Sequence, residues 1–356
     1  MPILTVLAAL TALVLLAATT GLAVRHRQRT RLRRASRLTG PDAVDEGRFV
    51  EIGGVPQWLR LRGEHRDNPV LLVVHGGPGS PYSLFTPRLR AWERYFTVVQ
   101  WDRRGSGRTL GRTRPAPGEL TFERMVDDGV EVAEFLRRHL GQERIVLLAG
   151  SMGTIVGLPM ALRRPDLFSA YVTTDVYVDL VANETEGRRL TLEQARTAGR
   201  RGAVRALERL DEDPTRWTVR DWGVRMQHAM ALGPTRRDPM TGLIAPLLLT
   251  NPEYTLRDAW TWLRGFAATR DAMFEQFMRW DARALGDTLE VPFVLVQGAS
   301  DGVTLTGPAL AHAASLRTPS TRVVQVPGAG HFCAFTHPEP FLEALLAHVP
   351  RVPEAA

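Results

Sequence analysis

Apolar residues gather in short runs along most of the chain from residue 49 onward. Residues 49–52 and 55–62 resemble strands, and the second run alternates apolar and polar residues as a half-exposed strand does. Six later runs are short and mostly continuously apolar, which is typical of strands buried on both faces of a parallel sheet. These runs cover residues 70–74, 97–101, 145–148, 170–174, 293–296 and 322–326.

Between several of these runs, apolar residues recur at spacings of three and four, as they do on one face of a helix. The helical patterns cover residues 122–140, 154–163, 307–316 and 340–348. Strands that alternate with helices predict a mostly parallel sheet covered by crossover helices. We therefore expect a doubly wound α/β domain built from residues 48–175 and 289–356.

Residues 176–288 break this alternation, because they contain no good strand pattern. Helix-like stretches over residues 192–210 and 256–280 stand there instead, and an insertion of this length between two strands predicts a helical cap. The second stretch is rich in aromatic residues. Most of them are expected to pack the cap helices together, and Trp260 and Trp262 are candidates for lining a substrate pocket.

An uncharged run of 22 residues, 3–24, precedes Arg25. As a helix it would span roughly 33 Å, enough to cross a bilayer core, so it predicts a single transmembrane anchor. Residues 25–47 follow as a basic linker, and the positive-inside rule then places the large domain on the cytoplasmic side. An atypical secretion signal, which would leave the protein secreted, is the alternative.

Positive charge is concentrated in that linker. All 45 basic residues are arginines, and seven of them lie between residues 25 and 37. The other arginines balance the 38 acidic residues, so the globular part is neutral and has no excess of positive charge for binding nucleic acid. The single cysteine, Cys333, excludes an internal disulfide and is expected to be a small buried side chain.

The segment AGSMG, residues 149–153, directly follows one predicted buried strand and directly precedes a helix. This is the setting of a nucleophile elbow, a turn so sharp that the positions two before and two after the serine must carry almost no side chain. Ala149 and Gly153 meet that requirement. Ser151 is therefore the candidate nucleophile, and the next helix directs its N-terminal N–H groups toward an oxyanion formed there.

A serine hydroxyl needs a base to accept its proton and an acid to orient that base. His331 lies in a glycine-rich loop after the last predicted strand, and Asp301 lies in the loop after the strand before it. Both loops follow carboxyl ends of strands, where open α/β sheets place their sites. The order Ser151, Asp301, His331 therefore predicts a catalytic triad, with Asp175, after the 170–174 strand, as the alternative acid.

The strand over residues 70–74 ends in HGGPG, residues 75–79, a segment with almost no side chains. Acyl transfer places negative charge on the former carbonyl oxygen, and that charge needs backbone N–H donors at roughly 2.7 to 3.1 Å. Bare backbone allows so close an approach. The N–H groups of Gly77 and Met152 are therefore the candidate oxyanion hole, and His75 is expected to brace the loop.

Three segments together resemble the proline iminopeptidase branch of the α/β-hydrolase superfamily: HGGPG at 75–79, WDRRGSGRT at 101–109 and AGSMG at 149–153. The family's second motif reads Asp-Gln-Arg-Gly-x-Gly-x-Ser, and here Arg103 stands for the glutamine and Thr109 for the serine. The resemblance extends over the whole chain beyond the linker. It implies a serine hydrolase that removes an N-terminal residue, often proline, from short peptides without metal or cofactor.

Peptidases of this family recognise the free amino terminus with carboxylates of the cap, so the resemblance makes Glu184, Glu186 and Glu193 candidate substrate-binding residues. The HGGPG segment serves the oxyanion and not the leaving group, so a carboxylesterase or lipase-like hydrolase is the alternative function. A non-catalytic protein that binds a ligand in its pocket is a third. Epoxide and haloalkane hydrolases of similar architecture need an aspartate nucleophile, which Ser151 does not provide.

Overall fold

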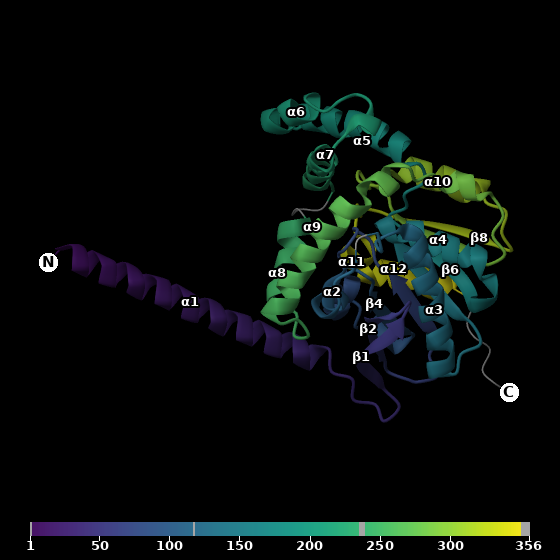
Figure 1. The fold of residues 1–356 in the computed structure, drawn as a ribbon, viewed down its shortest axis with the longest axis horizontal. Coiled ribbons are helices and arrows are strands. Elements are labelled where there is room, and N and C mark those ends of the chain that lie inside the picture. The colour runs from purple at the N-terminus through teal and green to yellow at the C-terminus, as the bar shows by residue number, and fades with distance from the viewer. Residues whose placement is uncertain (1, 117, 235–238, 350–356) are drawn as a thin grey trace.

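The computed structural model describes residues 2–116, 118–234 and 239–349, except for the side chains of residues 2, 4, 5, 8 and 9. A twisted sheet of eight strands crosses the main body, and helices flank it (Figure 1). Its strands lie in the order β1-β2-β4-β3-β5-β6-β7-β8. Their bounds are β1 (Val44–Ile52), β2 (Val55–Gly63), β3 (Val70–Val74), β4 (Thr97–Asp102), β5 (Ile145–Gly150), β6 (Phe168–Thr174), β7 (Phe293–Gly298) and β8 (Thr321–Val326).

The sheet is mostly parallel, as predicted. Strand β2 runs antiparallel to both β1 and β4, and every other neighbouring pair is parallel. Each run predicted as a strand lies inside one of the eight strands, so the strand positions are confirmed. The predicted burial on both faces is wrong for β8, a strand at the end of the sheet whose residues are mostly exposed or half-buried. In this register Val74 is level with Ala149, and Gly150 is level with Thr174. The loops that leave β3, β5 and β6 therefore start side by side at one edge of the sheet.

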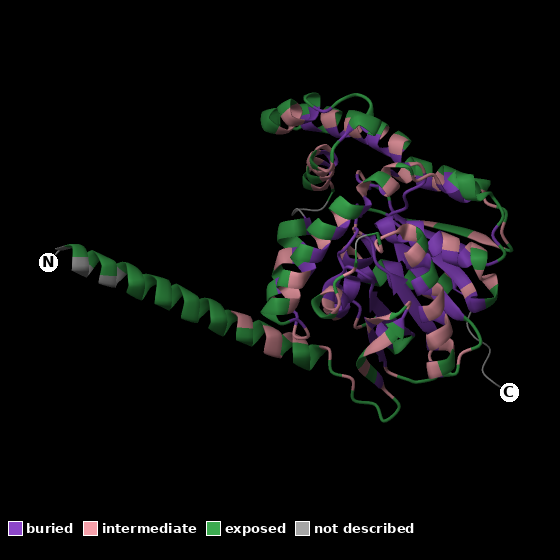
Figure 2. Ribbon diagram, viewed as in Figure 1, coloured by how far each residue is buried: buried purple, intermediate pink, exposed green. Residues whose placement is uncertain are grey.

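Helices on both faces bury the central strands of the sheet, which appear as the buried interior of the body in Figure 2. One face packs against α3 (Phe122–Leu140), α4 (Thr154–Arg163) and α10 (Thr306–Ser315). The other packs against α12 (Pro338–His348) and two short 3₁₀ turns, η1 (Tyr82–Arg88) and η2 (Trp92–Arg94). Shorter elements lie in the connecting loops: α2 (Gly107–Arg112), η3 (Ser151–Gly153), η4 (Pro165–Leu167) and α11 (Cys333–Thr336).

Local signals explain why these helices begin and end where they do. The side chain of Thr121 accepts a hydrogen bond from the Arg124 N–H and so caps the start of α3. The same helix ends at Gly141, whose φ of 69° is left-handed and favours glycine. Apolar residues of α3 at three and four spacing are buried, as the sequence predicts.

A set of helices connects β6 to β7 and forms the predicted cap (Figure 1). These elements are α5 (Leu180–Thr197), α6 (Arg201–Glu208), η5 (Pro214–Arg216), α7 (Val219–Ala231), η6 (Met240–Ile244), α8 (Ala245–Thr250), α9 (Leu256–Met278) and η7 (Ala282–Leu285). The stretch predicted as one helix over residues 192–210 is two helices, because Gly199 adopts a φ of 65° between α5 and α6. Buried aromatic residues such as Trp222 and Phe277 join the cap helices.

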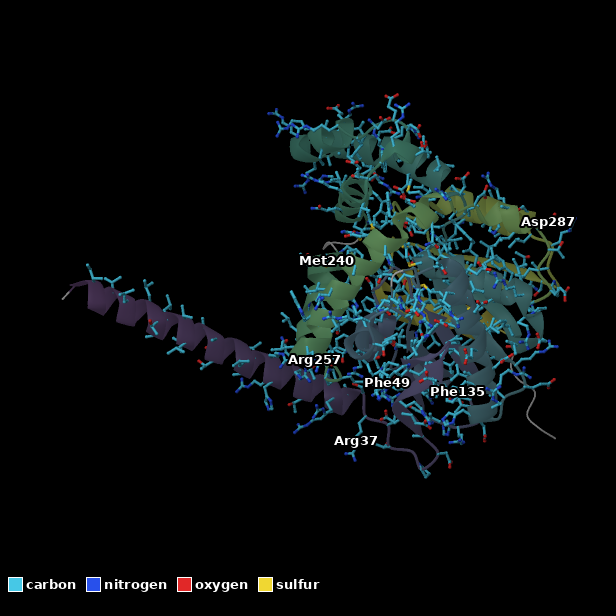
Figure 3. All side chains as sticks on the ribbon, in the orientation of Figure 1. Arg37, Phe49, Phe135, Met240, Arg257 and Asp287 are labelled. Carbon is cyan, nitrogen blue, oxygen red and sulfur yellow. The ribbon has the colours of Figure 1, made fainter. Side chains whose placement is uncertain are left out.

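The N-terminal residues form one long helix, α1 (Pro2–Ala35), which projects from the body. The side chains of α1 that the structure describes stand clear of the other elements until the helix reaches α8 (Figure 3). There Arg25 Nε donates to the carbonyl oxygen of Leu249 at 2.9 Å, and Arg29 donates to the carbonyl oxygen of Pro252 at 2.9 Å. These two arginines attach α1 to the cap.

The structure corrects two predictions about this region. Residues 25–47 are not a linker throughout, because α1 continues through the arginine cluster to Ala35 and β1 already begins at Val44. Arginine is a good helix former, so the change from apolar to basic residues does not end the helix. Among the described residues, no helix is both long and apolar enough to cross a membrane. The transmembrane anchor predicted over residues 3–24 is therefore not supported. The side chains of residues 4, 5, 8 and 9 within that segment lie outside the described part of the chain.

Candidate active site

Ser151 stands at the tip of a strained turn, where β5 ends and η3 begins. Its φ is 54°, a left-handed value that residues other than glycine adopt only at a cost in conformational energy. A Cβ at position 153 would collide with the carbonyl oxygen of Val74, so the glycine there is required. The methyl group of Ala149 is tolerated because α4 has a glycine opposite, and a Cβ on Gly157 would lie 2.5 Å from that of Ala149. The elbow geometry predicted around Ser151 is therefore present.

The structure brings Asp301 and His331 together at the same edge of the sheet. The Nδ1 atom of His331 lies 2.9 Å from Oδ2 of Asp301. The other oxygen of Asp301 accepts from the Val303 N–H at 2.8 Å and the Thr304 N–H at 3.1 Å. These bonds hold the carboxylate in one orientation toward the imidazole.

Charge and burial act in opposite directions on this pair. Burial lowers the pKa of His331, but the charges of Asp301 and Asp175 outweigh burial and raise it above its usual value of 6.5. Burial would raise the pKa of Asp301, but His331 and the hydrogen bonds lower it overall. A base oriented by an ionised acid is what activation of a serine requires.

Asp175, the alternative acid, lies close by but holds a different group. It is buried at the end of β6 with a φ of 52°, and its Oδ2 accepts from the backbone N–H of Phe332 at 3.2 Å. Burial and the nearby charge of Asp301 raise the pKa of Asp175 to about 7, although the charge of His331 lowers it. Asp301 is therefore the carboxylate that bonds His331, whereas Asp175 holds the backbone one residue further along.

Ser151 and His331 line the same cavity, which has a volume of about 50 Å³ between the sheet edge and the cap. No hydrogen bond joins Ser151 Oγ to His331 within the described part of the chain. Bonds of this kind are often long before a substrate binds, so the separation does not argue against the pair. Gly77 and Met152, the candidate oxyanion donors, line the cavity as well.

His75 braces the loops around Ser151, as expected. Its Nδ1 lies 2.9 Å from the carbonyl oxygen of Gly76, and its Nε2 lies 3.2 Å from the hydroxyl of Ser106. Burial and the neighbouring charge of Arg103 hold the pKa of His75 well below its usual value, so this imidazole is neutral. Arg103, which stands where the family has glutamine, donates to the His75 carbonyl oxygen at 2.7 Å.

The rest of the second motif also builds loop structure. Asp102 is fully buried and accepts from the Ser83 hydroxyl at 2.6 Å and from the Arg108 N–H at 2.9 Å. Burial raises its pKa to about 6. Thr109, the second departure from the family motif, accepts from the Trp58 N–H at 2.9 Å and donates to the Asp102 carbonyl oxygen. These contacts join β2, β4 and α2 beneath the HGGPG loop.

Of the two predicted aromatic pocket residues, the structure brings one to the cavity. Trp262 is buried, lines the cavity and donates from Nε1 to the Pro81 carbonyl oxygen at 3.2 Å. Trp260 is 60% exposed and does not line it. The two residues lie on opposite sides of α9, because residues two apart on a helix point in different directions.

The predicted carboxylates do not line the cavity either. Glu184 is fully buried, and Nη2 of Arg225 lies 2.6 Å from its Oε1. On α5, Glu193 is exposed and Glu186 is partly exposed, and their carboxylates lie 3.4 Å and 2.6 Å from the Arg189 guanidinium. No aspartate or glutamate is among the cavity-lining residues in the part of the chain that the structure describes. A role for these three residues in binding an amino terminus therefore has no geometric support.

Several cavity residues were not among the sequence candidates. Trp222, Met226 and Met230 lie along one face of α7, and Phe332 directly follows His331 in the chain. The spacing of four along α7 is a helical pattern that the sequence contains, but it does not tell which partner the face meets. Cys333 is fully buried, and burial raises its pKa, as expected of an inert thiol.

The same edge contains one cluster that resembles a metal site. Candidate ligand atoms of Asp175, Asp301 and His331 lie within 4.8 Å of one another. Metal ligation by His331 through Nδ1 would compete with its bond to Asp301, and Asp301 already accepts from the Thr304 hydroxyl at 2.6 Å. The donors that surround Asp301 fit a carboxylate that orients an imidazole.

The fold and this site define a class of protein. A family model for the alpha/beta hydrolase fold matches residues 69–338, so the chain belongs to the α/β-hydrolase family. Within this family the chain is similar to proteins named as aminopeptidases and proline iminopeptidases. It is 26% identical over 309 residues to the probable aminopeptidase YbaC of Bacillus subtilis, a match that covers 84% of this chain and 94% of that protein. It is also 36% identical over 110 residues to a probable proline iminopeptidase of Streptomyces coelicolor, covering 30% of this chain and 32% of that one.

Solved structures share the fold. A proline iminopeptidase-related protein of Thermus thermophilus matches with a TM-score of 0.58 and 24% identity, covering 87% of this chain and 100% of that chain. A membrane phospholipase A described as a bacterial virulence factor matches with a TM-score of 0.62 and 19% identity, covering 96% of both chains. At these identities the likeness concerns the fold alone.

Proposed function

We propose that the protein is a serine hydrolase that cleaves an amide or ester bond through an acyl-enzyme. The observation that carries this proposal is the arrangement at one cavity of Ser151, on a strained turn, and His331, whose Nδ1 lies 2.9 Å from Asp301. The three residues come from loops after β5, β7 and β8. Their order along the chain is that of α/β-hydrolase triads.

In this proposal Ser151 Oγ attacks the substrate carbonyl carbon while Nε2 of His331 accepts the hydroxyl proton. Asp301 stabilises the imidazolium, and the N–H groups of Gly77 and Met152 donate to the oxyanion. The imidazolium then protonates the departing amine or alcohol, which leaves an ester on Ser151. Water, deprotonated by His331, attacks that ester and releases the acid.

The finer proposal is an aminopeptidase of the proline iminopeptidase type. It is supported by the name of the Bacillus subtilis relative, whose match covers most of both chains. The motif resemblance at HGGPG and AGSMG supports it as well. An apolar cavity with methionine and aromatic walls suits the ring of an N-terminal proline.

A carboxylesterase is the second candidate, and one observation favours it. Recognition of a protonated amino terminus calls for a nearby carboxylate. The described lining of the cavity contains none, and Glu184 is occupied by Arg225. An uncharged ester needs no such partner.

Paired assays separate the two candidates. Proline naphthylamide and short-chain nitrophenyl esters are offered to the full chain, with Ser151→Ala as the control in each assay. Turnover of the amide supports the aminopeptidase, and turnover of the ester alone contradicts it. If neither substrate turns over and a fluorophosphonate does not label Ser151, the protein is a non-catalytic ligand-binding member of the fold.

A further inference from the structure

A buried arginine of the cap reaches the loop that carries the catalytic acid. Arg225 lies on α7 and has no exposed surface. Its Nη1 donates to the carbonyl oxygen of Gly302 at 2.8 Å, and its Nη2 donates to that of Val303 at 2.9 Å. These carbonyls follow Asp301 directly in the chain, so the guanidinium spans the two peptide groups next to the acid.

The same two peptide groups hold the carboxylate from their other side. The Gly302 carbonyl shares its peptide group with the Val303 N–H, which donates to Asp301 Oδ1 at 2.8 Å. The Val303 carbonyl shares its peptide group with the Thr304 N–H, which donates to the same oxygen at 3.1 Å. Because a peptide group is planar, fixing its carbonyl also fixes its N–H. A cation on the carbonyl side also polarises the N–H and strengthens its bond to the carboxylate.

A second cap helix holds the guanidinium in place. Glu184 of α5 accepts from Nε and Nη2 of Arg225 at 2.7 and 2.6 Å, a fork geometry that fixes the plane of the group. Neighbouring Asn183 donates to the Val303 carbonyl oxygen at 2.9 Å and accepts from the Leu305 N–H at 3.0 Å. A Cβ on Gly187 would lie 3.0 Å from the centre of the guanidinium, so the glycine makes room for it.

We propose that Arg225 is a positioning residue for the reaction: from the cap, it fixes the two peptide groups that orient Asp301 toward His331. This inference rests on the proposed function, since it concerns the acid of the proposed triad. It also gives Glu184 a role different from amine recognition. Glu184 is the counter-ion that keeps Arg225 charged and aligned.

Helix α7 thereby connects the substrate cavity to the acid. Trp222, Met226 and Met230 of α7 line the cavity, and Arg225 leaves the same helix toward the acid loop. A displacement of α7 would therefore also displace the group that holds the Gly302 and Val303 carbonyls.

Two altered proteins test this role by the rate at which a fluorophosphonate labels Ser151. Arg225→Met combined with Glu184→Met removes both charges, so that neither is left buried without a partner. Arg225→Lys keeps the positive charge but cannot make the paired hydrogen bonds of the guanidinium. The matched control combines Arg189→Met with Glu186→Met, an exposed ion pair on the same cap. Thermal unfolding shows which proteins are folded.

We expect the double variant at Arg225 and Glu184 to label about tenfold more slowly, or worse, because displaced catalytic groups cost large factors in rate. The control should label at the wild-type rate. If the double variant does not fold, Arg225→Lys decides, with an expected loss of several-fold. Wild-type labelling rates in a folded variant of Arg225 would overturn the proposal.

The pH dependence separates positioning from a merely structural role. His331 is faced by the carboxylates of Asp301 and Asp175 and by the guanidinium of Arg225. In Arg225→Lys the cation remains, so a poorly oriented Asp301 should lower the pH at which labelling is half lost by about half a unit. An unchanged midpoint with an unchanged rate contradicts the proposal. If Ser151 of the wild-type protein is not labelled, the proposed function is refuted instead. The pKa of His331, measured by NMR titration in the wild type and in Arg225→Lys, would then still decide the role of Arg225.

Discussion

The two walls of the cavity are built in different ways. On the sheet side, tight glycine-containing loops surround Ser151: Gly77 lines the cavity, and Gly76 and Gly153 pack closely behind it. The wall on the cap side consists of flexible or aromatic side chains, as at Met226 and Trp262. The first wall depends on backbone geometry, which few residue types can satisfy, whereas the second depends on side-chain shape, which many combinations can supply.

We therefore expect the sheet-side wall to determine whether the reaction occurs and the cap-side wall to determine which substrates are preferred. A Cβ added to Gly76 would lie 2.6 Å from Ser151 Cβ, so the sheet-side wall leaves no freedom near the nucleophile. Methionine on the cap side has three rotatable bonds and adapts to different ligands. Changes on the sheet side should therefore abolish the reaction, and changes in the cap should redirect it.

The largest effect should come from Asp301→Asn. An amide keeps the shape of the side chain but cannot stabilise the imidazolium, so kcat/KM should fall by about 10⁴-fold. Asp175→Asn, which alters a bond to the Phe332 N–H and not one to His331, should cost about tenfold. Steady-state kinetics of the two variants compare them directly, and the reverse order would make Asp175 the acid.

Gly76→Ala should come next. The new methyl group would crowd Ser151 Cβ and lie 2.8 Å from the Gly150 carbonyl oxygen, so the oxyanion loop must shift. A lost oxyanion donor costs about 10²- to 10³-fold in kcat. Gly202→Ala is the control, because a Cβ there has nothing within 4 Å. Equal kcat values for Gly76→Ala and wild type would show that this loop does not approach the reacting carbonyl.

Met226→Ala should change preference more than rate. Removing this side chain enlarges the cap side of the cavity without touching the triad. We expect the ratio of kcat/KM for a longer acyl ester over a short one to rise by about tenfold. The ratio is measured with nitrophenyl esters of increasing chain length, and equal losses on all of them would place Met226 outside the acyl site.

The smallest effect should come from Glu186→Gln. This carboxylate lies on the exposed face of α5, paired with Arg189 at 2.6 Å, and away from the cavity. Exposed pairs contribute about 0 to 1 kcal/mol to stability. Turnover of proline naphthylamide should stay within about twofold of wild type, and a large rise in KM would restore Glu186 as an amine-binding residue.

The sheet and the elbow were predictable because their signals are local. The six short, mostly apolar runs predicted as buried strands all lie in the sheet. A serine between small residues, with a strand before it and a helix after it, leaves few alternatives to the turn seen at Ser151. The position of His331 after β8 follows from the same reasoning.

The cap was predictable only as a helical insertion. The ion pair of Glu184 with Arg225 joins residues 41 positions apart in the chain, and no local sequence pattern predicts it. The choice between Asp301 and Asp175 likewise depends on which loop meets the imidazole, which is a matter of tertiary geometry. The orientation of Trp260 depends on the rotational phase of α9, which the density of aromatic residues does not reveal.

The N-terminal region shows a different limit. Hydropathy marks where the residue type changes at Arg25, but helix formation continues because arginine favours it. The contacts of Arg25 and Arg29 with carbonyl oxygens of the α8–α9 region then hold the end of α1 against the cap. A change in composition was therefore not a change in secondary structure.

The most direct test of the central claim is the pH dependence of covalent labelling at Ser151 by a fluorophosphonate. The three converging loops predict one labelled serine, no labelling in Ser151→Ala, and a rate that falls as pH drops through the pKa of His331. The carboxylates of Asp301 and Asp175 raise that pKa despite burial, so the midpoint should lie above 6.5. An unlabelled Ser151, or a rate that stays constant between about pH 5 and pH 9, would contradict the account.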